Sequence, residues 1–235
     1  MVAELYTPMP NAPARFERVA HRGLPVEKVE NTLPSFLAAI EHGADAIELD
    51  VHVSSDGIVV VHHDAVVLAH AIANTAWREL SHLVLEQGER IPRLQDVLEV
   101  VGSRAAVYIE LKGSRGDEEV VEIARKFGQR FAVHSFDHGA MARIARRAPG
   151  LPRGVLFDRD TAEPVKELHR AVGRVLPRDV WPHWSLVDRE FMIEASDLAL
   201  RVIPWTVNSA DVARELLALG VEGICTDDVR ILRAL

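Results

Sequence analysis

The chain has 235 residues, 48% of them hydrophobic, which suits one sizeable core and is near the usual length of a single α/β barrel. Its formal net charge of -8 excludes a nucleic-acid backbone as an expected partner, because such binding depends on clustered Lys and Arg. The single cysteine, Cys225, rules out an internal disulfide framework and fits a reducing compartment.

The amino-acid sequence shows no signal for membrane insertion or secretion. No apolar run approaches the roughly 20 residues that span a bilayer. Residues 1–13 lack the basic start and apolar core of a secretory signal. We therefore expect a cytoplasmic protein without stable membrane insertion, while the oligomeric state stays open.

The first part of the chain predicts an irregular lead-in and then β/α units. Residues 1–15 are rich in Pro and Ala, and a strand over 16–20 ends at a turn that Gly23 permits. A helix is expected from Asn31 or Thr32 to Gly43, because apolar residues recur at helical spacing. A strand over 47–52 and a returning strand over 58–61 follow. Residues 65–90 indicate a short insertion, mostly loop, with a short helix at 77–83.

The second part continues the alternation. Further helices are expected at 94–101, 120–127, 138–147, 161–172, 189–198, 210–218 and 228–234. Further strands are expected at 105–112, 130–134, 152–157, weakly near Val175, and at 201–205 and 223–226, while 179–187 stays open between strand and loop. Roughly eight strands alternating with helices predict a (β/α)8 TIM barrel, as a single domain over 1–235 with a short insertion after the second strand. No glycine-rich dinucleotide fingerprint follows the first strand, which argues against an open doubly wound sheet.

Two strands carry acidic residues at alternate positions. Within 47–52, Glu48 and Asp50 share one face, and the other face is all Ile, Leu or Val. Glu110 and Lys112 share a face on the third barrel strand in the same way. Crowded carboxylates repel each other and lose water when a sheet packs, so we expect Glu48, Asp50 and Glu110 to bind one divalent cation. The alternative is that these acids lie on solvated edge strands.

Other polar residues fall where the expected strands end. His21 and His63 flank the carboxylate strand and suit general acid and base catalysis, although they are also two of eleven histidines, or metal ligands. Arg22 and Lys112 would bind an anion, or merely pair with the carboxylates. Trp205 would contact a substrate's apolar atoms or cap the core.

The remaining strand-end residues have simpler interpretations. We expect Asn208 or Ser209, and Thr226, Asp227 and Asp228, to serve mainly in helix capping. His134 is one of the strand-end polar residues and carries no assigned role. Cys225 is expected to be a buried apolar residue.

The chain resembles the glycerophosphodiester phosphodiesterases over almost its whole length. The resemblance is carried, in order, by His21-Arg22-Gly23, Glu30-Asn31-Thr32, Glu48-Leu49-Asp50-Val51, Asp56-Gly57, His63-Asp64, Ile91-Pro92-Arg93-Leu94, Glu110-Leu111-Lys112, Ser135-Phe136-Asp137, Trp205-Thr206-Val207-Asn208 and Gly223-Ile224-Cys225-Thr226-Asp227-Asp228. It implies a TIM barrel that hydrolyses glycerophosphodiesters to glycerol 3-phosphate and an alcohol.

The resemblance also assigns roles. It implies a Ca²⁺ or Mg²⁺ on the three carboxylates, His21 and His63 as the acid/base pair, and Arg22 and Lys112 on the phosphate. Glu30 and Asn31 would support the site. Either water or the substrate's own glycerol 2-hydroxyl would attack phosphorus, and the sequence leaves this choice open.

The chain departs from the family pattern after His63-Asp64. Family members usually continue with a Leu-Asp-Arg-Thr-Thr-like run, whereas this chain continues with Ala65-Val66-Val67-Leu68-Ala69-His70. We therefore expect 65–68 to tune which head group is accepted and the mouth of the barrel to be open. Two rival functions stay open: a lysophospholipase D-type enzyme on the same scaffold, and a non-catalytic barrel that binds a phosphorylated ligand.

Overall fold

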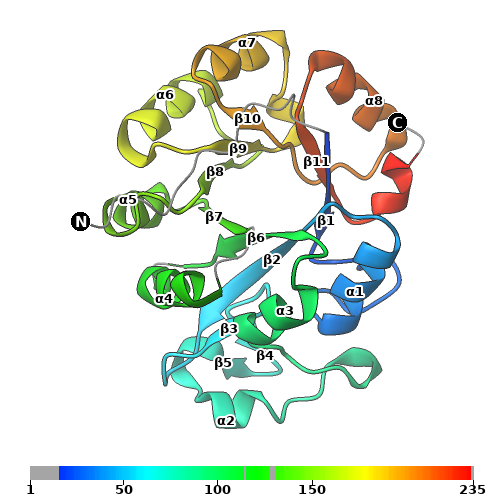
Figure 1. The fold of residues 1–235 in the computed structure, drawn as a ribbon, viewed down its shortest axis with the longest axis vertical. Helices are drawn as coiled ribbons and strands as arrows, with labels where there is room; N and C mark the ends of the chain where they lie inside the picture. Colours follow the sequence, from blue (N-terminus) through cyan, green and yellow to red (C-terminus); the bar gives the residue numbers. More distant parts are fainter. Residues whose placement is uncertain (1–15, 114, 128–130, 234–235) are drawn as a thin grey trace.

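The computed structural model describes residues 16–113, 115–127 and 131–233, so the expected lead-in over 1–15 lies outside the described residues. Eight parallel strands in the described part of the chain form the predicted barrel (Figure 1). They follow the order β10-β9-β8-β7-β6-β2-β1-β11. Their bounds are β1 Glu17–His21, β2 Ala46–Val53, β6 Ala106–Leu111, β7 Phe131–Ser135, β8 Arg153–Phe157, β9 Asp179–Pro182, β10 Arg201–Val202 and β11 Gly223–Thr226.

The two ends of this sheet meet through backbone hydrogen bonds. Glu222 N donates to Val202 O over 3.1 Å, and Cys225 N donates to Pro204 O over 3.0 Å. The first and last strands, β1 and β11, pair directly in parallel register. Residues of the first and last strands therefore become neighbours inside the barrel.

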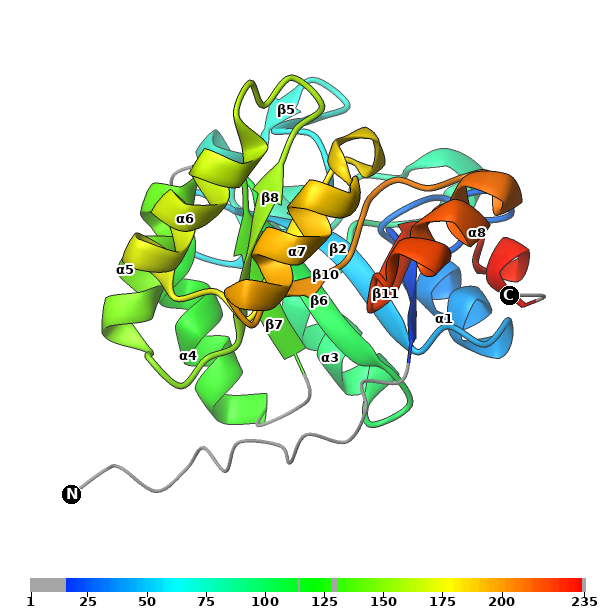
Figure 2. The same ribbon diagram turned by 90° about the horizontal axis from the view of Figure 1, so that it is seen from above.

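Helices cover the outside of the strands (Figure 1). They are α1 Leu33–Glu41, α3 Leu94–Val101, α4 Asp117–Phe127, α5 His138–Arg147, α6 Pro164–Val175, α7 Arg189–Asp197 and α8 Ala210–Leu219, with short 3-10 turns η3 Trp184–Leu186 and η4 Val229–Leu232. Figure 2 shows α4, α5 and α6 along one side of the strands and α1 and α8 along the other. None of the helices in the described residues is long and apolar enough to cross a bilayer.

The period of two along β2 places its side chains as predicted. Ile47, Leu49 and Val51 are buried in the layer between strands and helices. Glu48 and Asp50 are buried on the opposite, interior face, and β2 lies between β1 and β6 rather than at a solvated edge. The interior below the carboxylates is filled by mostly apolar side chains, namely Val19, Ala46, Ala106, Tyr108, Ala132, Leu156, Trp181, Ile203 and Cys225.

Several predicted elements are wrong in place or kind. Val175 does not lie in a strand but ends α6, because Leu168, Ala171 and Val175 form the buried stripe of that helix. The expected strand over 201–205 is only two residues long, and Pro204, which has no N–H, interrupts it. The expected terminal helix is the single 3-10 turn η4. The open segment 179–187 becomes β9 followed by η3.

The insertion has more structure than expected. After β3 (Val59–Val61), which pairs antiparallel with β2, it contains the hairpin strands β4 Val66–Val67 and β5 His70–Ala71, the turn η1 Ile72–Asn74, the short helix α2 Trp77–Leu80 and the turn η2 Glu86–Gly88. A small core of its own holds these pieces together, and Val67 belongs to it. The hairpin turn places Leu68 and Ala69 at φ 44° and 71°, a conformation usually taken by Gly or Asn. The amino-acid types at these two positions therefore carry no turn signal.

Candidate active site

The turn after β1 aims the first site residues. Gly23 has φ +91°, and a Cβ on it would lie 2.4 Å from Ser35 Oγ, so no other residue fits there without movement. Ser35 Oγ accepts from Leu24 N and donates to Arg22 O, which ties the turn to α1. Arg22 N in turn donates to the carbonyl of Glu48 over 2.9 Å. The His21-Arg22-Gly23 segment is thus fixed against the carboxylate strand.

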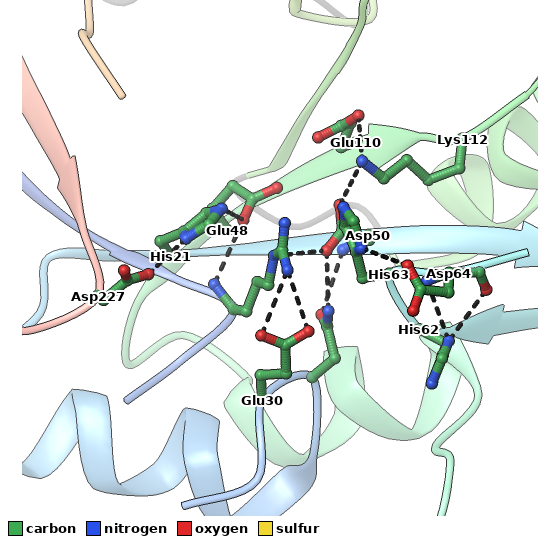
Figure 3. A network of polar contacts seen from close by, with 12 residues as sticks. His21, Glu30, Glu48, Asp50, His62, His63, Asp64, Glu110, Lys112 and Asp227 are labelled. Atoms are coloured by element: carbon green, nitrogen blue, oxygen red, sulfur yellow. Dashed lines mark hydrogen bonds and ion pairs between the residues drawn. The ribbon is translucent and has the colours of Figure 1, made fainter. Parts of the chain in front are cut away.

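Asp50 is the centre of the polar network (Figure 3). Its side chain accepts from Asn31 Nδ2 over 2.8 Å and lies 3.1 Å from Arg22 Nε and 3.2 Å from Lys112 Nζ. Burial by itself raises the pKa of Asp50, but the positive charges of Lys112 and Arg22 outweigh it and lower the pKa to about 2. Asp50 therefore stays ionised, and Asn31 also accepts from its backbone N–H.

Lys112 and Arg22 both bridge two carboxylates. Lys112 Nζ lies 2.8 Å from Glu110 Oε1, and Arg22 Nη1 donates to Glu30 Oε1 over 3.0 Å. Burial and the nearby negative charge of Asp50 raise the pKa of Glu110 to about 7, despite the opposing charge of Lys112. In this structure the side chains of Arg22 and Lys112 therefore pair with carboxylates, which is one of the two roles expected for them.

Glu48 has one carboxylate oxygen toward each of two histidines. Oε2 accepts from Arg22 N and lies 4.0 Å from His21 Nε2, while Oε1 lies 3.5 Å from His134 Nε2. Glu48, Glu110 and His134 are all buried, and each offers a ligand atom within 4.8 Å of the others.

These residues fit a divalent cation. Glu48 Oε1 is buried and accepts no hydrogen bond within the described part of the chain, whereas Asp50 Oδ1 lies 3.2 Å from Lys112 Nζ. Buried carboxylate oxygens without donors are costly unless a cation compensates them. Glu48 and Glu110 of the expected ligand set lie together with His134 in this cluster, and Asp50 is not part of it.

His21 is oriented from the far end of the chain. Its Nδ1 donates to Asp227 Oδ1 over 2.6 Å, and Asn208 Nδ2 donates to Asp227 Oδ2 over 2.6 Å. Burial lowers the pKa of His21, but the hydrogen bond to Asp227 and the charge of Glu48 outweigh it, so the net shift is upward. Of the residues expected to cap helices, Ser209 is the N-cap residue of α8 without a side-chain hydrogen bond, and the Asp228 side chain caps η4. Asn208 and Asp227 instead use their side chains in this chain of hydrogen bonds.

His63 follows β3 and has a similar partner. Its Nδ1 donates to Asp64 Oδ1 over 2.8 Å, and its backbone carbonyl accepts from His52 Nε2. His21 with Asp227 and His63 with Asp64 lie on opposite sides of Asp50 (Figure 3). Two histidines, each bonded to an aspartate, therefore flank the carboxylates.

Trp205 belongs to an aromatic group at the strand ends. Its Nε1 donates to Trp181 O over 3.0 Å, and its ring packs edge-on against Phe136 at 5.4 Å and His183 at 5.8 Å between centroids. Phe136 and His183 carried no role in the sequence interpretation. Cys225 is buried, which raises the pKa of its thiol, as expected for an inert core residue.

The sequence reasoning missed Asp227, Asn208, Asp64 and His134 as parts of the site. Asp227, Asp64 and Asn208 lie inside the motifs that carry the family resemblance, but their side chains had no role beyond capping. Asp227 contacts His21, which is 206 positions away, and Asn208 contacts Asp227 from the preceding strand end, so spacing alone indicated neither contact. His134 stood at a strand end, and only that position hinted at a role.

The chain is similar to known proteins over most of its length. The family model described as "Glycerophosphoryl diester phosphodiesterase family" matches residues 21–231. A glycerophosphodiester phosphodiesterase of Caldanaerobacter subterraneus is 31% identical over 230 residues, covering 89% of this chain and 93% of that protein. One from Bacillus altitudinis is 32% identical over 233 residues, covering 88% and 93%.

Solved structures share the fold. A glycerophosphodiester phosphodiesterase of Thermotoga maritima has a TM-score of 0.81 and 26% identity, covering 93% of this chain and 97% of that chain. A phosphodiesterase of Oleispira antarctica, solved with the product sn-glycerol-3-phosphate, has a TM-score of 0.84 at 23% identity, covering 93% and 95%.

Proposed function

The chain belongs to the glycerophosphoryl diester phosphodiesterase family, and we propose that it hydrolyses glycerophosphodiesters to sn-glycerol 3-phosphate and an alcohol with the help of one divalent cation. The observation that carries the proposal is the pair of aspartate-bound histidines, His21 and His63, on both sides of buried carboxylates. The product sn-glycerol-3-phosphate in the Oleispira antarctica structure supports the same substrate class.

Glu48, Asp50 and Glu110 would hold one Ca²⁺ or Mg²⁺. The cation, when bound, supplies positive charge to the phosphate oxygens and to the charge that develops at phosphorus. Arg22 and Lys112 would bind further phosphate oxygens through the N–H groups that their carboxylate contacts leave over. Glu30 and Asn31 hold Arg22 and Asp50 in place for this role.

The two histidines would move the protons. One takes the proton of the attacking oxygen, which forms a new bond to phosphorus. The bond from phosphorus to the leaving alcohol oxygen breaks, and the other histidine gives that oxygen a proton. Asp227 and Asp64 would keep each ring in one tautomer and stabilise its protonated form. The attacker is water or the glycerol 2-hydroxyl, and the latter gives a cyclic phosphate that water then opens.

Residues around the opening of the barrel would determine which head group is preferred. Val66 and Leu68 are exposed at the hairpin tip, and Trp205 is half-buried beside Phe136, so these residues are available to a head group. Val67 points into the core of the insertion instead. The expectation that 65–68 acts as one apolar segment at the mouth therefore needs correction at Val67.

A release assay tests the proposal. Glycerophosphocholine, glycerophosphoethanolamine, glycerophosphoglycerol and a lysolipid are each incubated with Ca²⁺, with Mg²⁺, or with excess EDTA after dialysis. We expect sn-glycerol 3-phosphate from the small diesters only when a cation is present. His21→Ala and His63→Ala should each lower kcat by roughly 10²- to 10⁴-fold.

Three results would contradict the proposal. Full activity in EDTA would remove the cation from the mechanism. Turnover of the lysolipid alone would favour a lysophospholipase D-type enzyme. Binding of the diesters without any turnover would favour the non-catalytic barrel.

A further inference from the structure

His134 on β7 is a buried histidine that the proposed mechanism does not use. Its side chain is 1% exposed, and neither ring nitrogen has a hydrogen-bond partner among the described residues. Both nitrogens of an imidazole are strong polar groups, and buried polar groups are nearly always bonded. A core role alone therefore leaves His134 unexplained.

Aromatic neighbours fix the orientation of this ring. Trp181 lies edge-on to it with 4.4 Å between centroids, and Tyr108 stacks at 6.3 Å. His134 also stands directly opposite Glu110 in the β6–β7 pairing. Packing and register thus aim Nε2 at the carboxylates, 3.5 Å from Glu48 Oε1.

The distances fit a shared ion. Ligand atoms bind cations at roughly 2.0–2.4 Å, so two ligands of one ion lie within about 5 Å of each other. Glu48, Glu110 and His134 meet this condition, with donor atoms within 4.8 Å. Asp50, the third carboxylate of the proposed site, lies outside this cluster and contacts Arg22, Lys112 and Asn31.

We propose that His134 Nε2 is a further ligand of the cation site and that it shifts the site's preference from Ca²⁺ toward Zn²⁺, Co²⁺ or Ni²⁺. Ca²⁺ takes oxygen ligands, whereas neutral imidazole suits the later transition metals. This inference rests on the cation site of the proposed function and adds to it the chemical class of cation.

Cation binding to the intact protein tests the inference, with Co²⁺ and Ca²⁺ as probes. His134→Gln should weaken Co²⁺ binding by roughly 10-fold or more and change Ca²⁺ binding by less than about 3-fold in calorimetry. The matched control is His138→Gln, because His138 bonds the carbonyl of Leu156 and lies outside the cluster. The control should bind both ions like the wild type.

A spectroscopic measurement identifies the ligand. In the Co²⁺-loaded wild type we expect a hyperfine-shifted imidazole N–H proton resonance that disappears in D2O and is absent from His134→Gln. Should this variant fail to fold, competition on the wild type decides, and tighter binding of Ca²⁺ than of Co²⁺ overturns the inference.

Glu48→Gln separates this inference from the proposed function. If His134→Gln binds Co²⁺ like the wild type while Glu48→Gln loses both ions, His134 is no ligand but the carboxylate site stands. If Glu48→Gln also keeps both ions, the cation site itself is misplaced.

Discussion

Replacing Asp227 by Asn should slow the reaction much more than it weakens the fold. Asp227 accepts from His21 Nδ1 with one oxygen and from Asn208 with the other. The amide of Asn has the same shape but no charge, and one of its two atoms becomes a donor. The protonated His21 then loses its counter-charge, and the tautomer of the ring is no longer fixed.

The size of the effect follows from that hydrogen bond. A hydrogen bond to a charged group contributes about 1.5–3 kcal/mol. If this is lost while His21 holds the proton, kcat falls by roughly 10- to 150-fold, since about 1.4 kcal/mol is tenfold in rate. KM should change little, because Asp227 contacts His21 and Asn208 rather than Arg22 or Lys112.

Asp228→Asn is the matched control. Asp228 is the next residue, and its carboxylate bonds Arg230 instead of His21. Both variants are compared by steady-state kinetics on the best small diester and by urea unfolding. A kcat for Asp227→Asn within about 3-fold of wild type would refute the orienting role of Asp227. Equal losses of kcat in both variants would assign the effect to local folding at the end of β11.

Three further predictions concern stability. The hydrogen bond from Arg230 outweighs partial burial and lowers the pKa of Asp228. The contribution of its charged pair with Arg230 is therefore present above the unfolded pKa of about 3.9 and lost as pH falls through the folded value. Asp228→Asn keeps a capping side chain but loses this pair, so it should cost about 0.2–1 kcal/mol at pH 7 and progressively less at acid pH, and an equal cost at both would contradict this. Val67→Ser should lower the free energy of unfolding in urea by about 1–3 kcal/mol, because Val67 is 2% exposed. The control Val66→Ser should change it by under about 0.5 kcal/mol, because Val66 is 51% exposed, and similar costs for the two variants would mean that the hairpin is packed differently. Gly23→Ala should lower the free energy of unfolding by at least about 1–3 kcal/mol, because the position has a positive φ. It should also weaken cation binding, because the clash with Ser35 moves Arg22, and an unchanged cation affinity in calorimetry would contradict that link.

The sequence by itself determined the features that follow local periodicity. Alternation along β2 set which side chains face the helices and which face the barrel interior, and the count of strands and helices set the fold. Both depend on neighbours within a few positions, where the backbone alone decides direction. The grouping of Glu48, Asp50, Glu110 and Lys112 at one site therefore follows from the amino-acid pattern alone.

Local signals were ambiguous where no turn residue or period marked the choice. Val175 is apolar and suits a strand as well as the end of a helix, and only packing of the α6 stripe decided it. The hairpin at Leu68 and Ala69 has no Gly or Asn, so its turn was invisible in the sequence.

Closure of the barrel decided the rest of the site. Asp227 meets His21 although 206 positions separate them, because β11 pairs with β1. His134 meets Glu48 across the interior, where the tilt of the strands and the packing of Trp181 fix the direction of the ring. Contacts between strands that are not neighbours depend on how the whole sheet closes, and no pattern along the chain carries that information.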